Sequence, residues 1–443
     1  MSPHLPNRRK DDARLARDLQ LFHVYRLLST SYLFLPVLIT FFVSRGLDFT
    51  HIVLLNSVYA LTAIVFEVPT GALADRFGRC RAMMLGSLLM AIGCVVDFNG
   101  RDFWTFALGE GLLALGMTLT SGADSAYLYD LLGAYGKEHE YRRYEGSATG
   151  AKLFGAAAAL VAGGFIGRHS PAVTYAATAC VCAGAALVAM MMREPTFVRE
   201  DDSDFLHGMA HAAKAVATRA PLRFAVGFSV LMFVLLRMGL YLYPPYLGKA
   251  GLDTAWVGIV LAILSVIGAL GAQRIEAVRR RLGEARLLWA MPLALAVTYA
   301  LCGRFVAVWG VALLAVQSLV NGLYSPFSKE LLNREIADSG QRATVLSVES
   351  MARRLAFGAF APIAGVLIDA HGLHTALYLC AGAGVTGVGL LVATSVRRRR
   401  RGLGDFAHEV TPTPLPEAAD ASDAADASDA SDDRTPASAS SNH

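Results

Sequence analysis

The chain has 443 residues, of which 54% are hydrophobic and 17% are charged, and its formal net charge at pH 7 is +4. This composition excludes an ordinary soluble domain, which carries more charge and needs less apolar surface. The positive charge does not indicate a nucleic-acid partner, because the basic residues gather at the ends of apolar segments. Apolar runs of about 20 residues recur from Tyr25 to Ala393, and each can span a hydrocarbon core only as a helix. The sequence therefore predicts an all-α membrane protein.

The chain opens with a polar, basic segment, residues 1–23, which lacks the apolar core of a cleavable signal peptide. Twelve apolar runs follow it, and each predicts one transmembrane helix. The expected spans are 24–44, 50–70, 82–98, 103–130, 147–167, 171–192, 223–247, 254–272, 286–303, 306–328, 344–369 and 374–395.

These spans fall into two groups of six. The first group forms an expected N-terminal six-helix bundle at 24–192, and the second forms a C-terminal six-helix bundle at 223–396. Residues 193–222 are expected to be a cytoplasmic linker that carries a surface helix from Phe205 to Ala217. Residues 397–443 hold a basic cluster and an Ala/Ser/Asp-rich tail with too little apolar surface to fold, so we expect a disordered cytoplasmic tail.

The loop charges alternate along the chain. Every second loop is rich in basic residues, whereas the loops between them carry at most one each. The positive-inside rule then places both termini in the cytoplasm, and an even number of spans agrees with that placement. We therefore expect a multi-pass protein of the bacterial inner membrane, acting as a monomer. The sparse basic residues of the opposite side are Arg45, Arg101, Arg168, Lys249 and Arg304.

The two halves of the sequence repeat each other. Gly46-Leu47-Asp48 follows the first span, and Gly251-Leu252-Asp253 follows the seventh, 205 positions later. Arg76-x-Gly78-x-x-Arg81 follows the second span, and Arg281-x-Gly283-x-x-Arg286 follows the eighth at the same offset. Two matches at equivalent places predict a 6+6 pseudo-repeat of parallel halves, with a solute site midway through the membrane between them.

The loop after the second span reads Gly71-Ala-Leu73-Ala-Asp75-Arg76-Phe-Gly78-Arg79-Cys-Arg81. It resembles the G-x-L-A-D-R-x-G-R loop of the major facilitator superfamily (MFS), and the resemblance covers about residues 20–396. Glu67 to Gly71, Ser121 to Asp130 and Arg342 to Ser347 are similar to a less characterised bacterial branch of permeases and drug-efflux proteins. The resemblance implies the MFS fold, secondary active transport and alternating access.

The same loop has a physical interpretation. Gly71 would allow close helix packing, Gly78 a tight turn, and the Asp75 carboxylate would meet the positive N-terminus of another helix. The resemblance implies that this helix is span eleven, which starts near Arg342. It also implies that an Arg79–Asp130 pair helps to latch the outward-facing state. The expected gating residues are Gly71, Asp75, Arg76, Gly78, Arg79 and Asp130.

Ionisable groups within spans are costly and usually face a cavity or a partner. Glu67 is expected to exchange protons or to form a structural hydrogen bond near Pro69. Glu110, between two glycines, faces a cavity or another helix, and Asp124 joins the gating network or a solute site. Arg237, midway along span seven, pairs with an acid across the bundle or binds a carboxylate or phosphate of the solute.

Other side chains have less specific expectations. Arg26 is expected to reach the membrane interface from the start of span one. Arg353 and Arg354 are expected to be satisfied locally, with Glu349 one turn before Arg353. The aromatic residues of spans one and seven are expected either to line a solute cavity or to anchor the helices at the membrane interface. They are Tyr25, Tyr32, Phe34, Phe41, Phe42, Tyr241, Tyr243 and Tyr246.

Three functions follow from these observations. The first is proton-coupled export, by antiport, of a small amphipathic compound or metabolite, although Ala159 and Leu160 replace the Gly-Pro that drug–proton antiporters of the family often carry. The second is import or facilitated passage of a small polar or anionic solute. The third is a non-transporting scaffold or sensor. An enzyme is not expected, and neither is a cofactor or metal, because no phosphate loop, metal cluster or nucleophile–base arrangement is present in the sequence.

Overall fold

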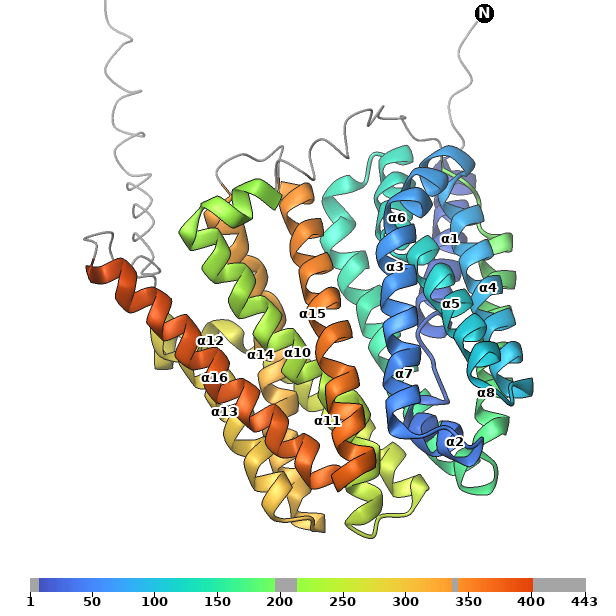
Figure 1. Ribbon diagram of the computed structural model, residues 1–443. Helices are drawn as coiled ribbons and strands as arrows, with labels where there is room; N and C mark the ends of the chain where they lie inside the picture. The colour runs from blue at the N-terminus through green and yellow to red at the C-terminus, as the bar shows by residue number, and fades with distance from the viewer. Residues whose placement is uncertain (1–7, 196–212, 337–341, 401–443) are drawn as a thin grey trace, which may run out of the picture.

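The computed structural model describes residues 8–195, 213–336 and 342–400, and within these ranges the regular structure is helical. Eleven of the described helical segments are long and apolar enough to cross a membrane, and a shorter apolar one covers Leu35–Ser44. Figure 1 shows the helices in two groups, α1–α8 on the right and α10–α16 on the left. The all-α membrane architecture is therefore confirmed.

The N-terminal group contains eight helices and two short 3-10 turns. Several are longer than the predicted spans and extend toward the upper end of Figure 1, where α1 begins. Their bounds are α1 Arg8–Leu28, η1 Leu35–Val37, α2 Leu38–Ser44, α3 Phe49–Phe77, α4 Arg79–Asn99, α5 Phe103–Thr120, α6 Ala123–Ala134, η2 Glu138–Glu140, α7 Tyr141–His169 and α8 Pro171–Met191.

The C-terminal group begins after residues 213–218, which are helical and overlap the end of the surface helix expected in the linker. The rest of that expectation, and the tail from 401 onward, lie outside the described residues. The bounds of this group are α10 Ala220–Lys249, α11 Thr254–Gln273, α12 Ile275–Leu282, α13 Glu284–Arg304, η3 Val308–Gly310, α14 Val311–Glu335, α15 Arg342–His371 and α16 Leu373–Arg400.

The first predicted span, 24–44, is wrong as a continuous helix. The structure has a helix to Leu28, an irregular segment over 29–34, and helical turns again from Leu35 to Ser44. Two local features account for the interruption. Ser31 donates its hydroxyl back to the carbonyl of Leu27, and Pro36 cannot donate a backbone hydrogen bond. The unwound backbone lies inside the protein, the only place where a membrane permits it.

The fourth predicted span is also interrupted. Its helix stops at Thr120, turns through Ser121 and Gly122, and resumes as α6 at Ala123. Gly122 has a φ of +84°, a conformation that a side chain would strain. Both interruptions belong to the N-terminal group.

The repeated Gly-Leu-Asp sequences are helix stop and start signals. Gly46 and Gly251 have φ values of +87° and +89° just after a helix, as a C-terminal cap requires. Asp48 accepts a hydrogen bond from the backbone of His51, and Asp253 accepts one from that of Thr254, so each aspartate caps the following helix. The sequence repeat therefore marks the same turn in each half.

The two halves meet along two pairs of helices, α3 with α15 and α7 with α11. In the second pair, a methyl group on Gly164 would come within 2.9 Å of the Thr254 carbonyl and 3.0 Å of the Gly258 α-carbon. Only residues without side chains allow backbones this close.

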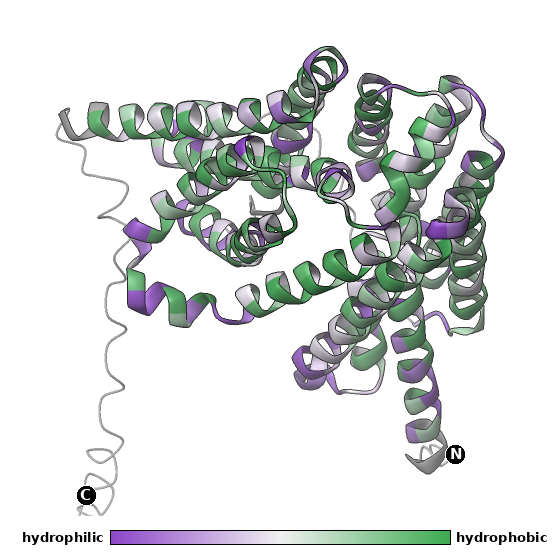
Figure 2. Cartoon of the chain, turned by 90° about the horizontal axis from the view of Figure 1, so that it is seen from below, coloured by the Kyte–Doolittle hydropathy of each residue, from purple (hydrophilic) through white to green (hydrophobic). Residues whose placement is uncertain are grey.

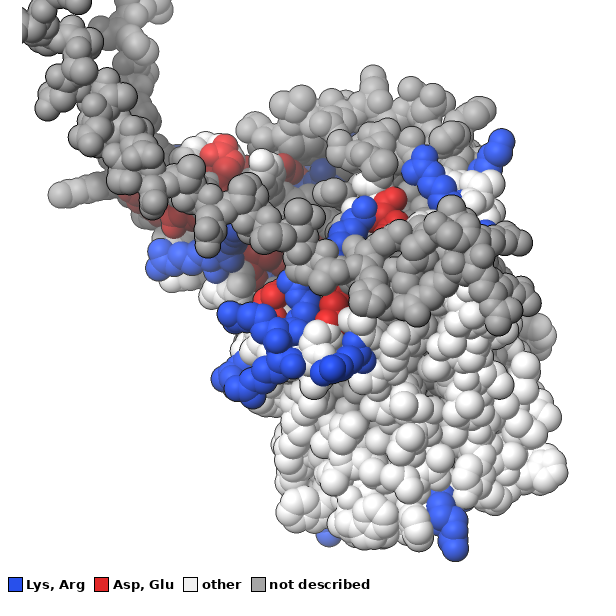
Figure 3. Space-filling view, turned by 90° about the vertical axis from the view of Figure 1, so that its left-hand side faces the viewer, with Lys and Arg blue, Asp and Glu red and all other residues white. Residues whose placement is uncertain are grey.

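The outer surface has the character of a membrane protein. Figure 2 shows mostly green and white helices, with purple at helix ends and connections. On the face seen in Figure 3, charged side chains gather toward the upper end above a broad white region. Large apolar side chains such as Phe154, Met190 and Leu390 are exposed, as lipid contact requires.

Candidate functional site

A cavity of about 490 Å³ lies between the two halves. The interrupted first span, α3, α4 and α5 form one wall, and α10 and α15 form the other. A central cavity between halves is where a carrier of this architecture binds its solute. The lining residues are Tyr32, Phe34, Leu35, Leu38, Phe42, Ile52, Asn56, Tyr59, Ala60, Met90, Glu110, Leu113, Met117, Phe233, Arg237, Leu240, Tyr241, Ser350, Arg353, Arg354 and Phe357.

Three arginines and one glutamate line this cavity. Arg353 Nε lies 2.9 Å from the Glu349 carboxylate, the local pair expected from the sequence. Arg354 lies 3.7 Å from Glu67, across the boundary between the halves, so the expected local pairing within span eleven is wrong for this residue. Arg237 makes no side-chain hydrogen bond or ion pair within the described part of the chain. Glu110 lines the opposite wall, but no carboxylate of the described residues lies within ion-pair distance of Arg237, so the predicted contact with an acid across the bundle is not formed.

Glu67 and Glu110 differ in their surroundings. The Glu67 side chain is 40% exposed, lies beside Arg354 and is not among the residues that line the cavity. Glu110 is only 9% exposed, and it lines the cavity with Arg237 on the facing wall. Of the two carboxyl groups, Glu110 is the one that a bound solute could reach directly.

Half of the aromatic side chains singled out from the sequence line the cavity, and three of the others, Tyr25, Phe41 and Tyr246, are buried elsewhere and are not exposed as interface anchors would be. Tyr32, Phe34, Phe42 and Tyr241 line the cavity. The others do not, and two of them have structural hydrogen bonds. Tyr25 pairs with Ser87, and Tyr246 donates to the carbonyl of Phe305.

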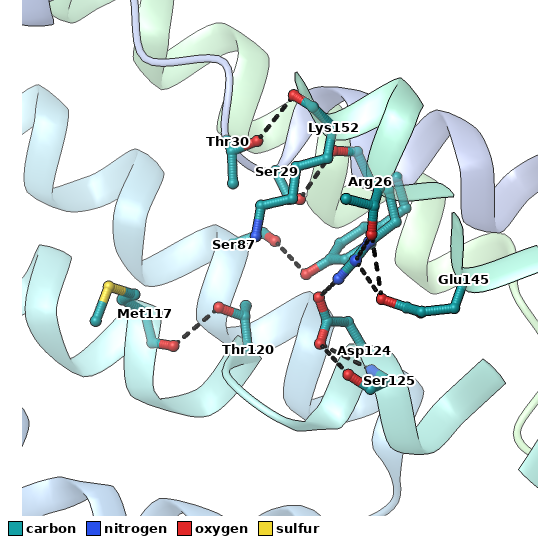
Figure 4. Close-up of polar contacts among 12 residues, drawn as sticks. Arg26, Ser29, Thr30, Ser87, Met117, Thr120, Asp124, Ser125, Glu145 and Lys152 are labelled. Carbon is teal, nitrogen blue, oxygen red and sulfur yellow. Dashed lines mark hydrogen bonds and ion pairs between the residues drawn. The ribbon is translucent and has the colours of Figure 1, made fainter. Parts of the chain in front are cut away.

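Asp124 lies away from the cavity, in a buried ion cluster within the N-terminal group (Figure 4). Arg26 is only 5% exposed. Its guanidinium contacts the Asp124 carboxylate and donates a hydrogen bond to Glu145 at 2.7 Å. The expectation that Arg26 reaches the interface is therefore wrong. The helix begins at Arg8, so Arg26 lies near its inner end, where the first span is interrupted.

A corresponding network ties three helices of the C-terminal group. Ser229 on α10 pairs with the Tyr324 hydroxyl of α14 at 2.9 Å and donates to Glu349 of α15. Glu349 in turn holds Arg353. In both groups, buried polar contacts connect the first, fourth and fifth spans, and in the C-terminal group they reach the cavity through Arg353.

The motif loop is only partly packed in this conformation. Nothing lies within 4 Å of a methyl group placed on Gly71, so the expected close packing there is absent from the described residues. Gly78 has a φ of +107° and makes the tight turn. Arg79 Nε lies 3.6 Å from Asp130. The side chains of Asp75 and Arg342 lie outside what the structure describes.

Glu194, which the sequence analysis did not single out, completes the turn. Its carboxylate accepts hydrogen bonds from the backbone of Arg79 at 2.5 Å and of Cys80 at 3.0 Å, so it caps the start of α4. A methyl group on Gly78 would overlap this carboxylate. Gly78 is therefore required for two reasons: it adopts the positive φ of the turn, and it leaves space for the Glu194 carboxylate.

The lower end of the molecule in Figure 1 is closed by contacts between the halves. Asp369, near the end of α15, accepts hydrogen bonds from the backbone of Phe49 at 2.9 Å and of Thr50 at 2.8 Å, and from the Thr50 hydroxyl. Arg168, at the end of α7, lies 3.3 Å from Asp253, which caps α11. At the upper end, by contrast, Leu73, Arg76 and Phe77 of α3 are exposed.

Several of these residues could not be identified as site residues from the sequence. Asn56, Tyr59 and Ser350 line the cavity, but polar residues inside spans are common, and only the pairing of helix faces selects them. Asp369 could have been noticed as an acid near the end of a span, opposite a helix start.

The chain is similar to known transporters. A sequence model described as the Major Facilitator Superfamily matches residues 27–332. The inner membrane transport protein YajR of Escherichia coli is 33% identical over 101 residues, which are 23% of this chain and 22% of YajR. An uncharacterised transporter of Buchnera aphidicola is 28% identical over 75 residues, which are 17% of this chain and 19% of the relative. The alignments thus span about a fifth of these relatives.

Solved structures share the fold. The nucleoside transporter NupG superposes with a TM-score of 0.72 at 14% sequence identity, over 86% of this chain and 98% of that structure. At such low identity the likeness concerns the fold alone.

Proposed function

Because the chain belongs to the Major Facilitator Superfamily, and is a membrane transporter rather than an enzyme, we propose that it carries a small amphipathic organic anion by alternating access. The proposal rests on one observation. Arg237 lines the central cavity and has no carboxylate partner among the described residues, whereas the cavity's other two arginines have one each. The acidic group of the solute would be that partner.

The charge balance supports an anion. A guanidinium group taken out of water needs an acid or an anionic ligand to offset its lost hydration. Glu110 is the only carboxylate that lines the cavity, against three arginines, within the described ranges. Arg353 and Arg354 already have Glu349 and Glu67 beside them, so Arg237 is the cavity cation left to attract an anionic solute and to repel a cationic drug placed next to it. Proton antiport of such a drug, the first function expected from the sequence, is therefore less favoured than passage of an anion.

The rest of the cavity suits an apolar body. Phe34, Phe42, Phe233, Tyr241 and Phe357 provide aromatic surface, and Asn56 and Ser350 provide uncharged polar groups. Sites for small molecules are typically apolar with a few placed polar groups that fix orientation. A flat hydrophobic carboxylate or phosphate ester matches this arrangement.

The orientation follows from the loop charges. With the basic loops in the cytoplasm, the upper end of Figure 1 faces the cytoplasm and both termini lie there, in a bacterial inner membrane. The contacts of Asp369 and Arg168 then close the outer side, so this conformation is inward-facing. The exposed cytoplasmic end of α3 supports this assignment. The Arg79–Asp130 pair, which was expected to belong to the outward-facing latch, is present at 3.6 Å, so in this proposal it is not part of what opens.

Ligand-induced stabilisation of the purified protein tests the charge preference. We expect benzoate to raise the melting temperature of the wild type, and its neutral and cationic counterparts benzamide and benzylamine to have little effect. A ligand at 100 times its Kd stabilises by about 2.7 kcal/mol. Arg237→Met should lose the benzoate shift, whereas Arg101→Met, a change in an exposed loop, should keep it. Stabilisation by benzylamine but not by benzoate, or a benzoate shift that survives Arg237→Met, would contradict the proposal.

A further inference from the structure

A second, smaller pocket lies in the C-terminal group, between α14 and α15, which both pack against α10 (Figure 1). Its volume is about 140 Å³, less than a third of the 490 Å³ of the central cavity. Six of the eight described side chains that line it carry a polar atom. The pocket therefore suits a small polar group rather than the apolar body of a solute.

One face of α14 supplies the pocket with three hydrogen-bond donors. Ser325, Ser328 and Lys329 lie on this face at positions i, i+3 and i+4. Hydroxyls within helices often donate back to a carbonyl one turn earlier, as Ser265 does to Leu261. Neither of the two pocket hydroxyls does so, although Ser328 is only 4% exposed, and Lys329 has no ion pair within the described ranges. All three donors are therefore available to an acceptor in the pocket.

The charges of the pocket do not balance. Among the described residues that line it there are two cations, Lys329 and Arg353, and one acid, Glu349. This acid is already engaged, because it accepts a hydrogen bond from Ser229 and lies 2.9 Å from Arg353 Nε. Lys329 is left as an unbalanced positive charge, as Arg237 is in the central cavity. An unbalanced cation beside hydroxyl donors selects an anion.

Arg353 connects this pocket to the central cavity, because it lines both. Its guanidinium also lies 5.1 Å from the centroid of the Phe233 ring, which belongs to the cavity wall. On α15 the pocket extends from Leu346 to Arg353 and the cavity from Ser350 to Phe357. The pocket thus lies about one turn nearer to the start of this helix. In the orientation proposed above, that is the cytoplasmic side of the cavity.

We propose that this pocket is a second anion-binding site, which holds the acidic group of the solute as the solute passes between the cavity and the cytoplasm. The proposal rests on the anion-carrying function proposed above. Lys329, Ser325 and Ser328 bind the carboxylate or phosphate group, and Arg353 links this position to the cavity of Arg237. The pocket offers little apolar surface for the body of the solute, so its occupancy is brief and lasting affinity depends on Arg237.

Binding of labelled inorganic phosphate to the purified full-length protein, measured by equilibrium dialysis, tests the site. We expect the wild type to bind phosphate, and Lys329→Gln to bind it about tenfold more weakly, as the loss of a hydrogen bond between charged groups implies. Lys329→Arg should retain binding. Lys214→Gln, which removes an exposed lysine from the helix at residues 213–218, is the matched control and should bind as the wild type does. Arg237→Met should also retain binding, because Arg237 does not line this pocket.

Exchange of labelled benzoate by reconstituted vesicles tests the route. At benzoate concentrations well below saturation, Lys329→Gln should exchange about tenfold more slowly than the wild type, because an attracting charge accelerates entry. The rise in melting temperature that benzoate causes should be unchanged in this variant, since Arg237 still holds the bound solute. A general structural defect would reduce both quantities. Lys214→Gln should exchange at the wild-type rate.

The two measurements separate the possible failures. A wild type that binds no phosphate, or phosphate binding that Lys329→Gln leaves unchanged, would overturn the second site. Phosphate binding weakened in Lys329→Gln with benzoate exchange at the wild-type rate would show a site for free phosphate off the route, and would overturn the role in passage. A wild type that neither binds nor exchanges benzoate would contradict the proposed function instead, and the phosphate measurement would still decide whether the pocket binds an anion.

Discussion

The Arg26→Met variant is expected to unfold at a much lower temperature than the wild type. The substitution removes the guanidinium that joins Asp124 and Glu145, and these carboxylates are 18% and 25% exposed. Breaking a buried ion pair from one side leaves uncompensated charge and costs about 3–5 kcal/mol. The loss should appear as a lower melting temperature of the detergent-solubilised protein.

An exposed pair provides the matched control. Lys137 and Asp12 are 3.2 Å apart with side chains 36% and 66% exposed, so Lys137→Met should cost less than about 1 kcal/mol. Neutralising the two carboxylates that Arg26→Met leaves unpaired should restore part of the stability. Arg26→Met combined with Asp124→Asn and Glu145→Gln should regain part of the lost stability, because no unpaired charge remains. If Arg26→Met alone melted with the wild type, the cluster would not stabilise the fold.

The second large effect concerns the closed lower end. We expect Asp369→Ala to shift the protein toward the conformer that is open at this end. The aspartate joins α15 to the start of α3 through three hydrogen bonds, but it is itself exposed, so we expect about 1–2 kcal/mol. That difference changes the ratio of two conformers by roughly 5- to 30-fold. Alternating access requires such an equilibrium between few states.

Electron–electron distance measurements can detect this shift. Trp104 and Trp309 are exposed near the lower end in different halves, so Trp104→Cys and Trp309→Cys provide sites for spin labels in a background without other cysteines. Asp369→Ala should add a longer distance to the distribution. Asp48→Ala is the matched control, since Asp48 caps the same helix from its own half and should leave the distances unchanged. Identical distributions in Asp369→Ala and the wild type would show that this contact does not hold the halves together.

The sequence predicted the parts of this fold that depend on local physics. Spans follow from hydrophobic length, and Gly46-Leu47-Asp48 with its repeat marks real caps because glycine and aspartate act within one turn. Gly78 belongs to the same class. Each of these features is decided by residues close to one another in the chain.

Features that depend on distant partners were not predictable. The burial of Arg26 depends on Glu145, which lies far along the chain on α7, and on a helix start at Arg8 that hydropathy does not mark. Asp97 falls within the apolar run 82–98, and its position against Gly109 appears only when α4 and α5 pack. Of the site candidates, Glu110 and Arg237 meet at one cavity, whereas Glu67 and Asp124 lie outside it.

The measurement that tests the central claim most directly is exchange of labelled benzoate across the membrane of reconstituted vesicles. The wild type should exchange external labelled benzoate for benzoate loaded inside, without any pH gradient. Arg237→Met should not do so, and Arg101→Met should exchange at the wild-type rate. Exchange that persisted in Arg237→Met, or wild-type vesicles that exchanged benzylamine in preference to benzoate, would contradict an anion carrier built around Arg237.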